Sequence, residues 1–192
     1  MRVTKAQAQA NRAHIVETAS VLFRERGYDG VSVADLMAAA GFTHGGFYKH
    51  FASKADLMAE AAACGFSQSL ENRAQVDISE FITRYLSREH RDGRGVGCTM
   101  AALCGDAARQ PEEIKATFAS GIENLLAALE PGEGAKDETG QQLRAAIISR
   151  VAHAVGALVL SRACPDDSPL ADEILAVCRT RILASLPPLS VD

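Results

Sequence analysis

A short segment between residues 43 and 54 gathers side chains that can bond to an anionic polymer. Hydroxyl, imidazole and ammonium groups are common partners of phosphate oxygens and base edges. Two glycines inside a short helical segment cost roughly 1 kcal/mol each relative to alanine, which suits a place where another molecule approaches the backbone. The segment therefore predicts a surface that contacts duplex DNA. Its members are Thr43, His44, Gly45, Tyr48, Lys49, His50 and Lys54.

Different members of this surface suit different contacts with DNA. Lys49 can reach O6 and N7 of guanine, and Thr43 can touch a thymine methyl group or a phosphate. His44 can donate or accept at a base edge. For each of these three, a phosphate or water contact is the alternative, because most protein–DNA hydrogen bonds go to the backbone. Lys54 begins a helix, where a cation opposes the helix dipole, so a phosphate partner would account for it. Gly45 would permit close approach of the duplex.

The segment before this surface predicts a short helix and a tight turn. Ser32 is expected to be the N-cap, with Asp35 three residues later in a variant of the capping box. The backbone N–H groups of Ser32 and Val33 would then lie at a helix start, where they could meet a phosphate. Gly41 supplies the turn into the second short helical segment, from Thr43 to His50.

About the first sixty residues resemble the helix-turn-helix module of the tetracycline-repressor (TetR) family of bacterial transcriptional regulators. The remaining two thirds is similar to that family only in being helical and of similar length. The resemblance implies phosphate contacts for Tyr48 and His50. A second glycine, Gly46, is less common in the family. The matching residues are Ile15, Ala19, Leu22, Phe23, Gly27, Tyr28, Val31, Ser32, Val33, Thr43, Gly45, Phe47, Tyr48, His50, Phe51, Ser53, Lys54 and Leu57.

Helical patterns also flank the module. Residues up to about Gln9 are expected to form a mobile polar arm, followed by a helix from about Asn11 to Gly27. Gly27 is a natural C-terminal stop. Ser53, with Asp56 three residues on, predicts the start of a helix that runs to about Arg73 and links the module to the rest of the chain.

The rest of the chain predicts further helices and no strand. Because apolar residues recur at helical spacing throughout, the expected fold is all-α with about nine helices. We expect a DNA-binding domain over residues 1–54 and a helical effector-binding and dimerisation domain over residues 55–192. Later helices are expected from Asp77 through Leu86, over 98–109, 111–129, 139–162 and 169–186, with a loop at 91–95, a break at 131–134 and an end at Pro187–Pro188.

Charge is distributed unevenly along the chain. The net charge is −4, which by itself opposes binding to nucleic acid. Up to Lys54, however, the chain contains seven lysines and arginines and four acidic residues. From Ala55 onward it contains thirteen lysines and arginines and twenty acidic residues. A positively charged N-terminal segment, here residues 1–54 and called the head, followed by a negatively charged remainder is typical of a DNA-binding module joined to a part that does not bind DNA.

Composition excludes several other classes of protein. Without an apolar N-terminal run or a stretch long enough to span a membrane, the sequence predicts a cytoplasmic protein. Five cysteines without a CxxC pair favour thiols over a disulfide framework, and no spacing predicts a zinc site or another cofactor. No phosphate-binding loop, HExxH helix or Ser/His/Asp order is present, so we do not expect an enzyme, although a small helical enzyme without a recognisable motif stays an alternative.

The TetR resemblance also implies a homodimer and an effector. Two heads roughly 34–36 Å apart would read a palindromic operator, and a small molecule that prefers another conformer would release it. Repressor and activator action both stay open. The last two helices would pair through Ile147, Val151, Val155, Leu158, Ile174, Cys178 and Ile182. A hydrophobic or aromatic effector would contact Phe66, Leu70, Phe81, Tyr85, Cys98, Met100, Leu103, Phe118 and Ile122, although such apolar stripes are more often core.

Two other functions are compatible with the sequence. Cys98 follows a glycine-rich loop near a predicted helix start, with Arg94 close by, so it could sense electrophiles or oxidants, with Cys104 as a partner. A buried, inert cysteine is the simpler interpretation. A helical interaction module that has lost DNA binding is the second alternative, and the basic head argues against it.

Overall fold

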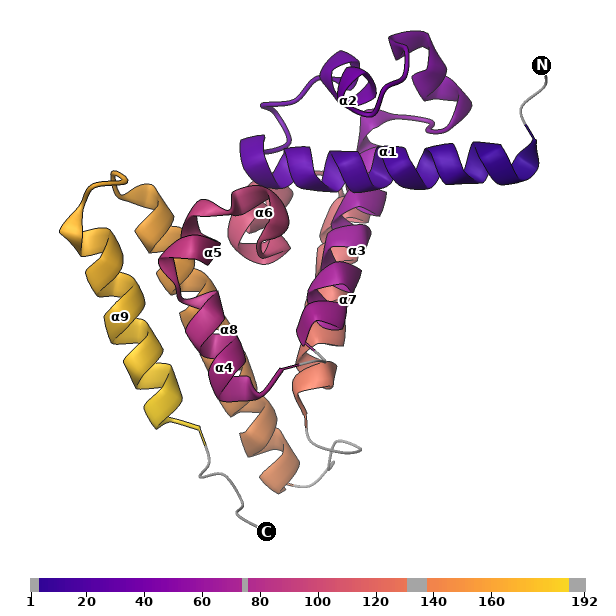
Figure 1. Ribbon diagram of the computed structural model, residues 1–192. Helices are drawn as coiled ribbons and strands as arrows, with labels where there is room; N and C mark the ends of the chain where they lie inside the picture. The colour runs from indigo at the N-terminus through magenta and orange to yellow at the C-terminus, as the bar shows by residue number, and fades with distance from the viewer. Residues whose placement is uncertain (1–3, 74–75, 131–137, 187–192) are drawn as a thin grey trace. The chain divides into compact units, whose positions relative to one another are not determined.

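The computed structural model describes residues 4–73, 76–130 and 138–186, and within these ranges it contains nine α-helices, two 3-10 helices and no strand (Figure 1). The all-α prediction is confirmed. The chain folds as two compact units, unit 1 with residues 1–69 and 94–123, and unit 2 with residues 70–93 and 124–192. The predicted functional boundary at residue 54 stays a prediction. The elements are α1 (Lys5–Arg26), α2 (Val33–Ala39), η1 (His44–Lys49), α3 (Lys54–Arg73), α4 (Ile78–Tyr85), α5 (Arg88–Asp92), η2 (Arg94–Val96), α6 (Thr99–Ala107), α7 (Glu112–Leu129), α8 (Glu138–Ala163) and α9 (Pro169–Ala184).

The first helix is longer than the sequence pattern predicted. α1 begins at Lys5, because the Thr4 side chain caps it by accepting a hydrogen bond from the Gln7 N–H at 3.2 Å. The expected mobile arm is therefore wrong from residue 5 onward, and residues 1–3 lie outside the described ranges. At the other end, Gly27 stops the helix with φ of 73°, and its N–H donates to the Phe23 carbonyl at 2.8 Å.

The short helices of unit 1 follow the predicted capping signals. Ser32 and Asp35 form a complete capping box at the start of α2. Gly41 makes the turn with φ of 78°. The next segment is a 3-10 helix, η1, whose Phe47 is fully buried in the core of unit 1. Ser53 then caps α3 by accepting from the Asp56 N–H at 3.1 Å.

The middle of the chain contains one departure from the sequence prediction. The stretch expected to be a loop at residues 91–95 is the end of α5 followed by η2. Ser87 caps α5 by accepting from the His90 N–H at 3.1 Å, and Arg91 of this helix is buried rather than solvated. The glycine-rich composition of this stretch predicted a loop. The sequence pattern could not indicate α5, because its Arg91 is held by contacts with residues about 70 positions away. The predicted break at 131–134 and the Pro187–Pro188 stop lie outside the described residues.

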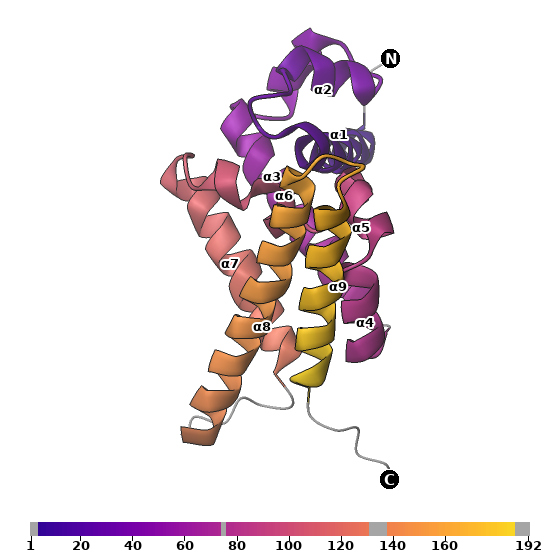
Figure 2. The same cartoon turned by 90° about the vertical axis from the view of Figure 1, so that its left-hand side faces the viewer.

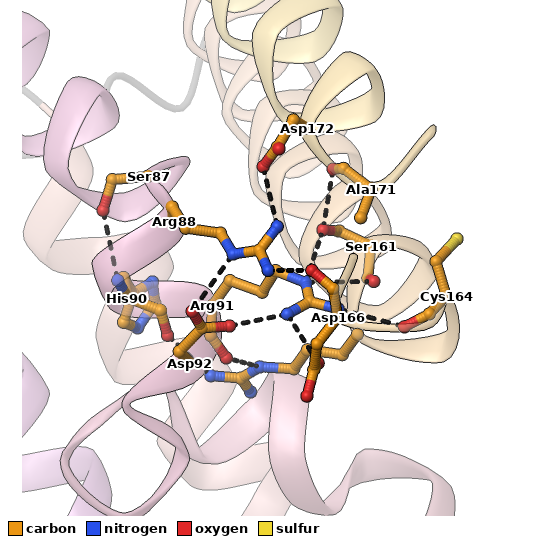
Figure 3. A network of polar contacts seen from close by, with 11 residues as sticks. Ser87, Arg88, His90, Arg91, Asp92, Ser161, Cys164, Asp166, Ala171 and Asp172 are labelled. Carbon is orange, nitrogen blue, oxygen red and sulfur yellow. Dashed lines mark hydrogen bonds and ion pairs between the residues drawn. The ribbon is translucent and has the colours of Figure 1, made fainter. Parts of the chain in front are cut away.

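Unit 2 is built on the paired helices α8 and α9, which lie side by side in both ribbon views (Figures 1 and 2). α4 packs against α9, and α5 packs against α8. Arg91 of α5 is only 1% exposed and bonds to the turn between α8 and α9 (Figure 3). Its Nε donates to the Ser161 carbonyl at 3.2 Å, its Nη2 to the Cys164 carbonyl at 3.0 Å, and its Nη1 pairs with Asp166 at 3.0 Å. These contacts fix the helix pair to α5.

Candidate nucleic-acid interface

Within η1 only Phe47 is buried, and the residue that follows it faces solvent. Phe47 is 0% exposed, and its ring lies 5.4 Å from that of Phe51, which is also buried. Tyr48, the next residue after Phe47, is 68% exposed and stands edge-on to the Phe47 ring at 5.2 Å. A tyrosine exposed in this way offers both its ring and its hydroxyl to another molecule, and tyrosine is enriched at interfaces. The buried phenylalanines thus hold Tyr48 outward.

The other polar residues of the predicted surface are also accessible to solvent. Thr43, His44 and Lys49 are exposed, and His50 is half-buried near the rings of Phe42 and Phe51. No acidic residue occurs between Asp35 and Asp56, so the surface carries donors without a local carboxylate that would compete with a phosphate. This composition suits an anionic duplex.

The two glycines of η1 differ in their surroundings. A Cβ built on Gly45 would meet no atom within 4 Å, whereas one on Gly46 would lie 3.5 Å from Cε of Met37. Neither glycine has a positive φ, a conformation that within the described residues occurs only at Gly27 and Gly41. The folded chain therefore does not require glycine at position 45, which leaves close approach of a partner as a reason for it.

The side chain of Lys54 makes contacts within the protein that the sequence did not predict. Its Nζ donates to the Tyr28 carbonyl at 2.5 Å and lies 5.9 Å from the centre of the Phe23 ring. An ammonium group has three donors, so this hydrogen bond leaves others for a phosphate. The structure adds a second role for Lys54, because it joins the start of α3 to the corner after α1.

The start of α2 supports only part of the predicted phosphate contact. The Ser32 N–H already donates to Oδ2 of Asp35 at 3.0 Å, so the expectation that this N–H is available for a phosphate is wrong. Hydrogen bonds from Ser32 also lower the pKa of Asp35, which keeps the capping carboxylate charged. Val33, the first residue of α2, stays a candidate because N–H groups at a helix start lack intrahelical partners.

Two residues that the sequence patterns did not identify support this surface. Arg12 of α1 lies over the Phe51 ring at 4.3 Å and pairs with Glu60 of α3. Asp106 of α6 accepts from the Tyr28 N–H at 3.1 Å. Both contacts join residues far apart in the sequence, so no local spacing could have indicated them.

The predicted effector residues fall into both units. Phe66, Met100, Leu103 and Phe118 are buried in unit 1, where the rings of Phe66 and Phe118 meet edge to face at 5.4 Å. The burial of these four side chains is typical of a hydrophobic core. Ile122 and Cys98 also belong to unit 1, whereas Leu70, Phe81 and Tyr85 belong to unit 2, and the rings of the last two lie 5.8 Å apart.

The predicted dimer residues are mostly turned toward their own unit. Ile147, Leu158 and Ile182 are buried, and Val151, Val155, Ile174 and Cys178 are half-buried. Buried side chains cannot line a surface for a second copy, so the first three are wrong as contact residues. The large apolar side chains that α8 and α9 do expose are Leu143, Ile148, Val159, Leu160, Leu170 and Val177.

Among the described helices, one is long and apolar enough to cross a membrane by length and composition, so the expectation that no stretch of the sequence reaches this length is wrong. It spans Gly140–Ala163 within α8, and only 22% of its most apolar stretch is buried. Core helices of proteins outside membranes can share this length and composition. The large apolar side chains that this stretch exposes include Ile148, Val159 and Leu160.

The cysteines are thiols rather than disulfides. Cys98 is the N-cap of α6 and is buried, as the simpler interpretation predicted. Burial, reinforced by Cys98, raises the pKa of the Cys104 thiol to about 11. A raised pKa opposes thiolate formation, so Cys104 is poorly suited to act as a reactive partner.

Comparisons with known proteins match the N-terminal part of the chain, which contains the candidate surface. Residues 15–61 match the model of the family described as bacterial regulatory proteins, tetR family. The transcriptional regulator AcrR of Shigella flexneri is 42% identical over 59 residues, 31% of this chain and 27% of that protein. TtgR of Pseudomonas putida is 43% identical over 80 residues, covering 42% and 38%. The repressor DhaR of a Mycobacterium species is 51% identical over 43 residues, 22% of each chain. The matches thus span well under half the length of these relatives.

Solved structures extend the likeness in fold to nearly the whole chain. A TetR-family regulator from Cytophaga hutchinsonii gives a TM-score of 0.69 at 20% identity, covering 96% of this chain and 98% of the other. The reduced form of NemR from E. coli gives 0.70 at 16% identity, covering 95% and 100%. At such identities the likeness concerns the fold alone.

Proposed function

We propose that this chain, which belongs to the TetR family of bacterial transcriptional regulators, is a homodimeric repressor that a small-molecule effector releases from a palindromic operator. The observation that carries the proposal is the outward Tyr48, whose ring stands against the buried Phe47 in a segment that carries donors and no acidic residue. Family membership makes it a regulatory protein rather than an enzyme.

The DNA contacts divide into two kinds. Tyr48, His50 and Lys54 would bond to phosphates and position the head, because such contacts carry no sequence information. Lys49, Thr43 and His44 lie at η1 and would read base edges in the major groove. Gly45 would let the backbone of η1 approach the duplex.

A homodimer is supported by the outer face of α8. From Ala145 to Ala163 the exposed residues of α8 include no Asp, Glu, Lys or Arg, and they carry three large apolar side chains, Ile148, Val159 and Leu160. An uncharged face of this length would be unusual on a helix that remained in water. Small residues such as Ala152 would allow the backbones of two α8 helices to approach closely. Together with Leu170 and Val177 of α9, this face fits a second copy of the same pair.

The effector is proposed to be hydrophobic or aromatic, because the candidate residues from Phe66 to Ile122 are mostly apolar. Binding would favour the conformer whose heads no longer match the operator spacing. Repression rather than activation is favoured by relatives named as repressors, among them DhaR. A cytoplasmic location, with association to the nucleoid when bound to DNA, follows from this function.

Thiol sensing within the same fold is the second candidate. Cys98 lies at the N-terminal end of α6, which favours it, but its burial and the raised pKa of Cys104 count against a reactive pair. If Cys98→Ser protein is still released from DNA in full by electrophiles, this candidate is wrong.

Selection of bound duplexes from a random pool, repeated with candidate metabolites, tests the main proposal. We expect a palindrome whose half-sites are centred about one helical turn or a multiple apart. One metabolite class should abolish the selection. A purified chain that ignores every duplex at modest ionic strength would contradict DNA binding, and a non-palindromic site bound by a monomer would contradict the dimer.

A further inference from the structure

His14 is an exposed residue of α1 whose imidazole forms no hydrogen bond or ion pair in the described part of the chain. Its backbone carbonyl accepts from the Thr18 hydroxyl at 2.8 Å, as is common within a helix. The aromatic neighbour of the imidazole is Phe42, whose ring centre lies 6.4 Å away in an edge-on arrangement. An imidazole in this position can donate a hydrogen bond to an acceptor outside the protein.

Phe42 connects His14 to the candidate DNA surface. It is half-buried in the turn between α2 and η1, and its ring centre lies 6.5 Å from that of His50, the C-cap of η1. α1 and α2 pack against each other within unit 1, which brings His14 next to this turn (Figure 1). The imidazoles of His14 and His50 therefore share one phenyl ring as a neighbour. Because phosphates follow one another roughly every 3.4 Å along a strand of duplex DNA, two groups this close can contact the same stretch of backbone.

The charge around His14 also favours an anionic partner. The sequence before it contains Arg2, Lys5 and Arg12 and no aspartate or glutamate, and the first acidic residue of the chain is Glu17. The start of α1 adds the positive end of the helix dipole. Arg12 is already paired with a glutamate of α3, whereas Lys5 and His14 form no ion pair within the described ranges. The first half of α1 therefore attracts a polyanion.

We propose that His14 is a further contact to the DNA backbone, which extends the DNA surface from η1 onto α1. The inference rests on the proposed DNA-binding function and adds to it a residue of the first helix. Its partner is a phosphate on the same stretch of strand that His50 contacts. The imidazole would donate to a phosphate oxygen and, when protonated, would add a positive charge to this hydrogen bond. Such a contact positions the head on the duplex and carries no sequence information.

Two other roles of His14 are competing explanations. Glu17 is exposed one turn later on α1, where it could pair with a protonated His14, although no such ion pair forms within the described ranges. Alternatively, the imidazole only covers the Phe42 ring. In both cases His14→Ala would leave DNA affinity unchanged, and in the second case it would also lower Tm.

Fluorescence anisotropy with a labelled duplex from the random-pool selection, measured over a series of salt concentrations, tests the contact. His14→Ala should weaken binding roughly fivefold on every duplex sequence while Tm stays unchanged. His14→Lys keeps a donor and a full charge, so it should bind at least as tightly as the wild type. The slope of log affinity against log salt concentration should differ between these two variants by about 0.9, the value for one phosphate contact.

Ala13→Lys is the matched control, because it puts the same charge on the neighbouring exposed position, about 100° around the helix. Its salt slope should stay close to that of the wild type. If Ala13→Lys and His14→Lys change affinity and slope equally, general attraction by charge explains the effect and the inference is wrong. Unchanged affinity of His14→Ala beside a weakened Tyr48→Phe would overturn this inference alone. A wild-type chain that binds no duplex would overturn the proposed function itself.

Discussion

The backbone N–H of Tyr28 donates to Oδ2 of Asp106 at 3.1 Å, across 78 positions of sequence. Tyr28 lies just after α1, and Asp106 lies near the end of α6. The same carboxylate would lie 2.7 Å from a Cβ on Gly27, so glycine is required there by space as well as by its φ of 73°. This hydrogen bond joins the corner of the head to a helix that the sequence places in the other functional domain.

Asp106→Ala should therefore destabilise unit 1. It leaves a part-buried N–H without its acceptor, which costs about 1–3 kcal/mol. Urea unfolding measures the loss. Arg109→Gln is the control, because it removes only the exposed partner of Asp106, at 2.8 Å, and should change the free energy of unfolding by well under about 1 kcal/mol. Equal effects of the two changes would show that the Tyr28 contact contributes nothing.

Two tyrosines give a matched test of the DNA surface. Tyr48→Phe should weaken binding to all duplexes roughly tenfold while stability stays unchanged, since the side chain is exposed and a hydrogen bond to a charged phosphate is strong. Tyr28→Phe should leave DNA affinity unchanged and should not destabilise the chain, because the buried Tyr28 hydroxyl has no partner in the described ranges. Fluorescence anisotropy and thermal unfolding separate the two effects. Unchanged affinity of Tyr48→Phe would place the DNA surface elsewhere.

The two glycines of η1 give a second test. Gly45→Ala should leave the free protein as stable as before or up to about 1 kcal/mol more stable, since nothing lies within 4 Å of the added methyl group. It should nevertheless weaken DNA binding, because the methyl group stands where the duplex approaches. Gly46→Ala, whose methyl group would contact Met37, should have the smaller effect on affinity. The reverse order would contradict the proposed approach over Gly45.

The outer face of α8 should determine the oligomeric state. Ile148→Glu puts a charge into the exposed apolar face and should convert the dimer into a folded monomer, with weaker operator binding. Sedimentation velocity measures the mass, and circular dichroism checks the fold. Gln141→Glu, an exposed change near the start of the same helix, serves as the control. A dimer that survives Ile148→Glu would show that another surface pairs.

Cys104 should make stability depend on alkaline pH. Its pKa in the folded chain is about 11, above the ordinary value of 9.0, because burial disfavours the thiolate. In this range the folded state holds a proton that the unfolded state has lost, so stability should fall as pH rises from about 9 to 11. Cys104→Ala should flatten this dependence relative to wild type. An identical pH profile in the two proteins would remove the thiol as its cause.

Local signals in the sequence were enough to predict much of the head. The Ser32–Asp35 capping box and the turn at Gly41 depend on neighbours within a few residues, and both are confirmed. The inward bond of Lys54 could not be predicted, because its acceptor, the Tyr28 carbonyl, is 26 residues away.

The dimer face shows where sequence periodicity fails. Apolar residues occur on every side of α8, so the pattern could not tell which side faces its own unit. Ile147 and Leu158 point inward, and their immediate neighbours Ile148 and Val159 point outward. A rotation of the helix by one residue, about 100°, exchanges the two sets. Only packing against α9 decides between them.

The buried Arg91 has a consequence for how unit 2 meets any partner. Its guanidinium donates to the carbonyls of Ser161 and Cys164 at the end of α8, and Oγ of Ser161 in turn donates to the Ala171 carbonyl of α9 at 2.9 Å. Parting the two helices would therefore break a buried hydrogen-bond network. The outer face of this helix pair is consequently preorganised before contact, and little conformational entropy remains to be lost when another surface docks on it.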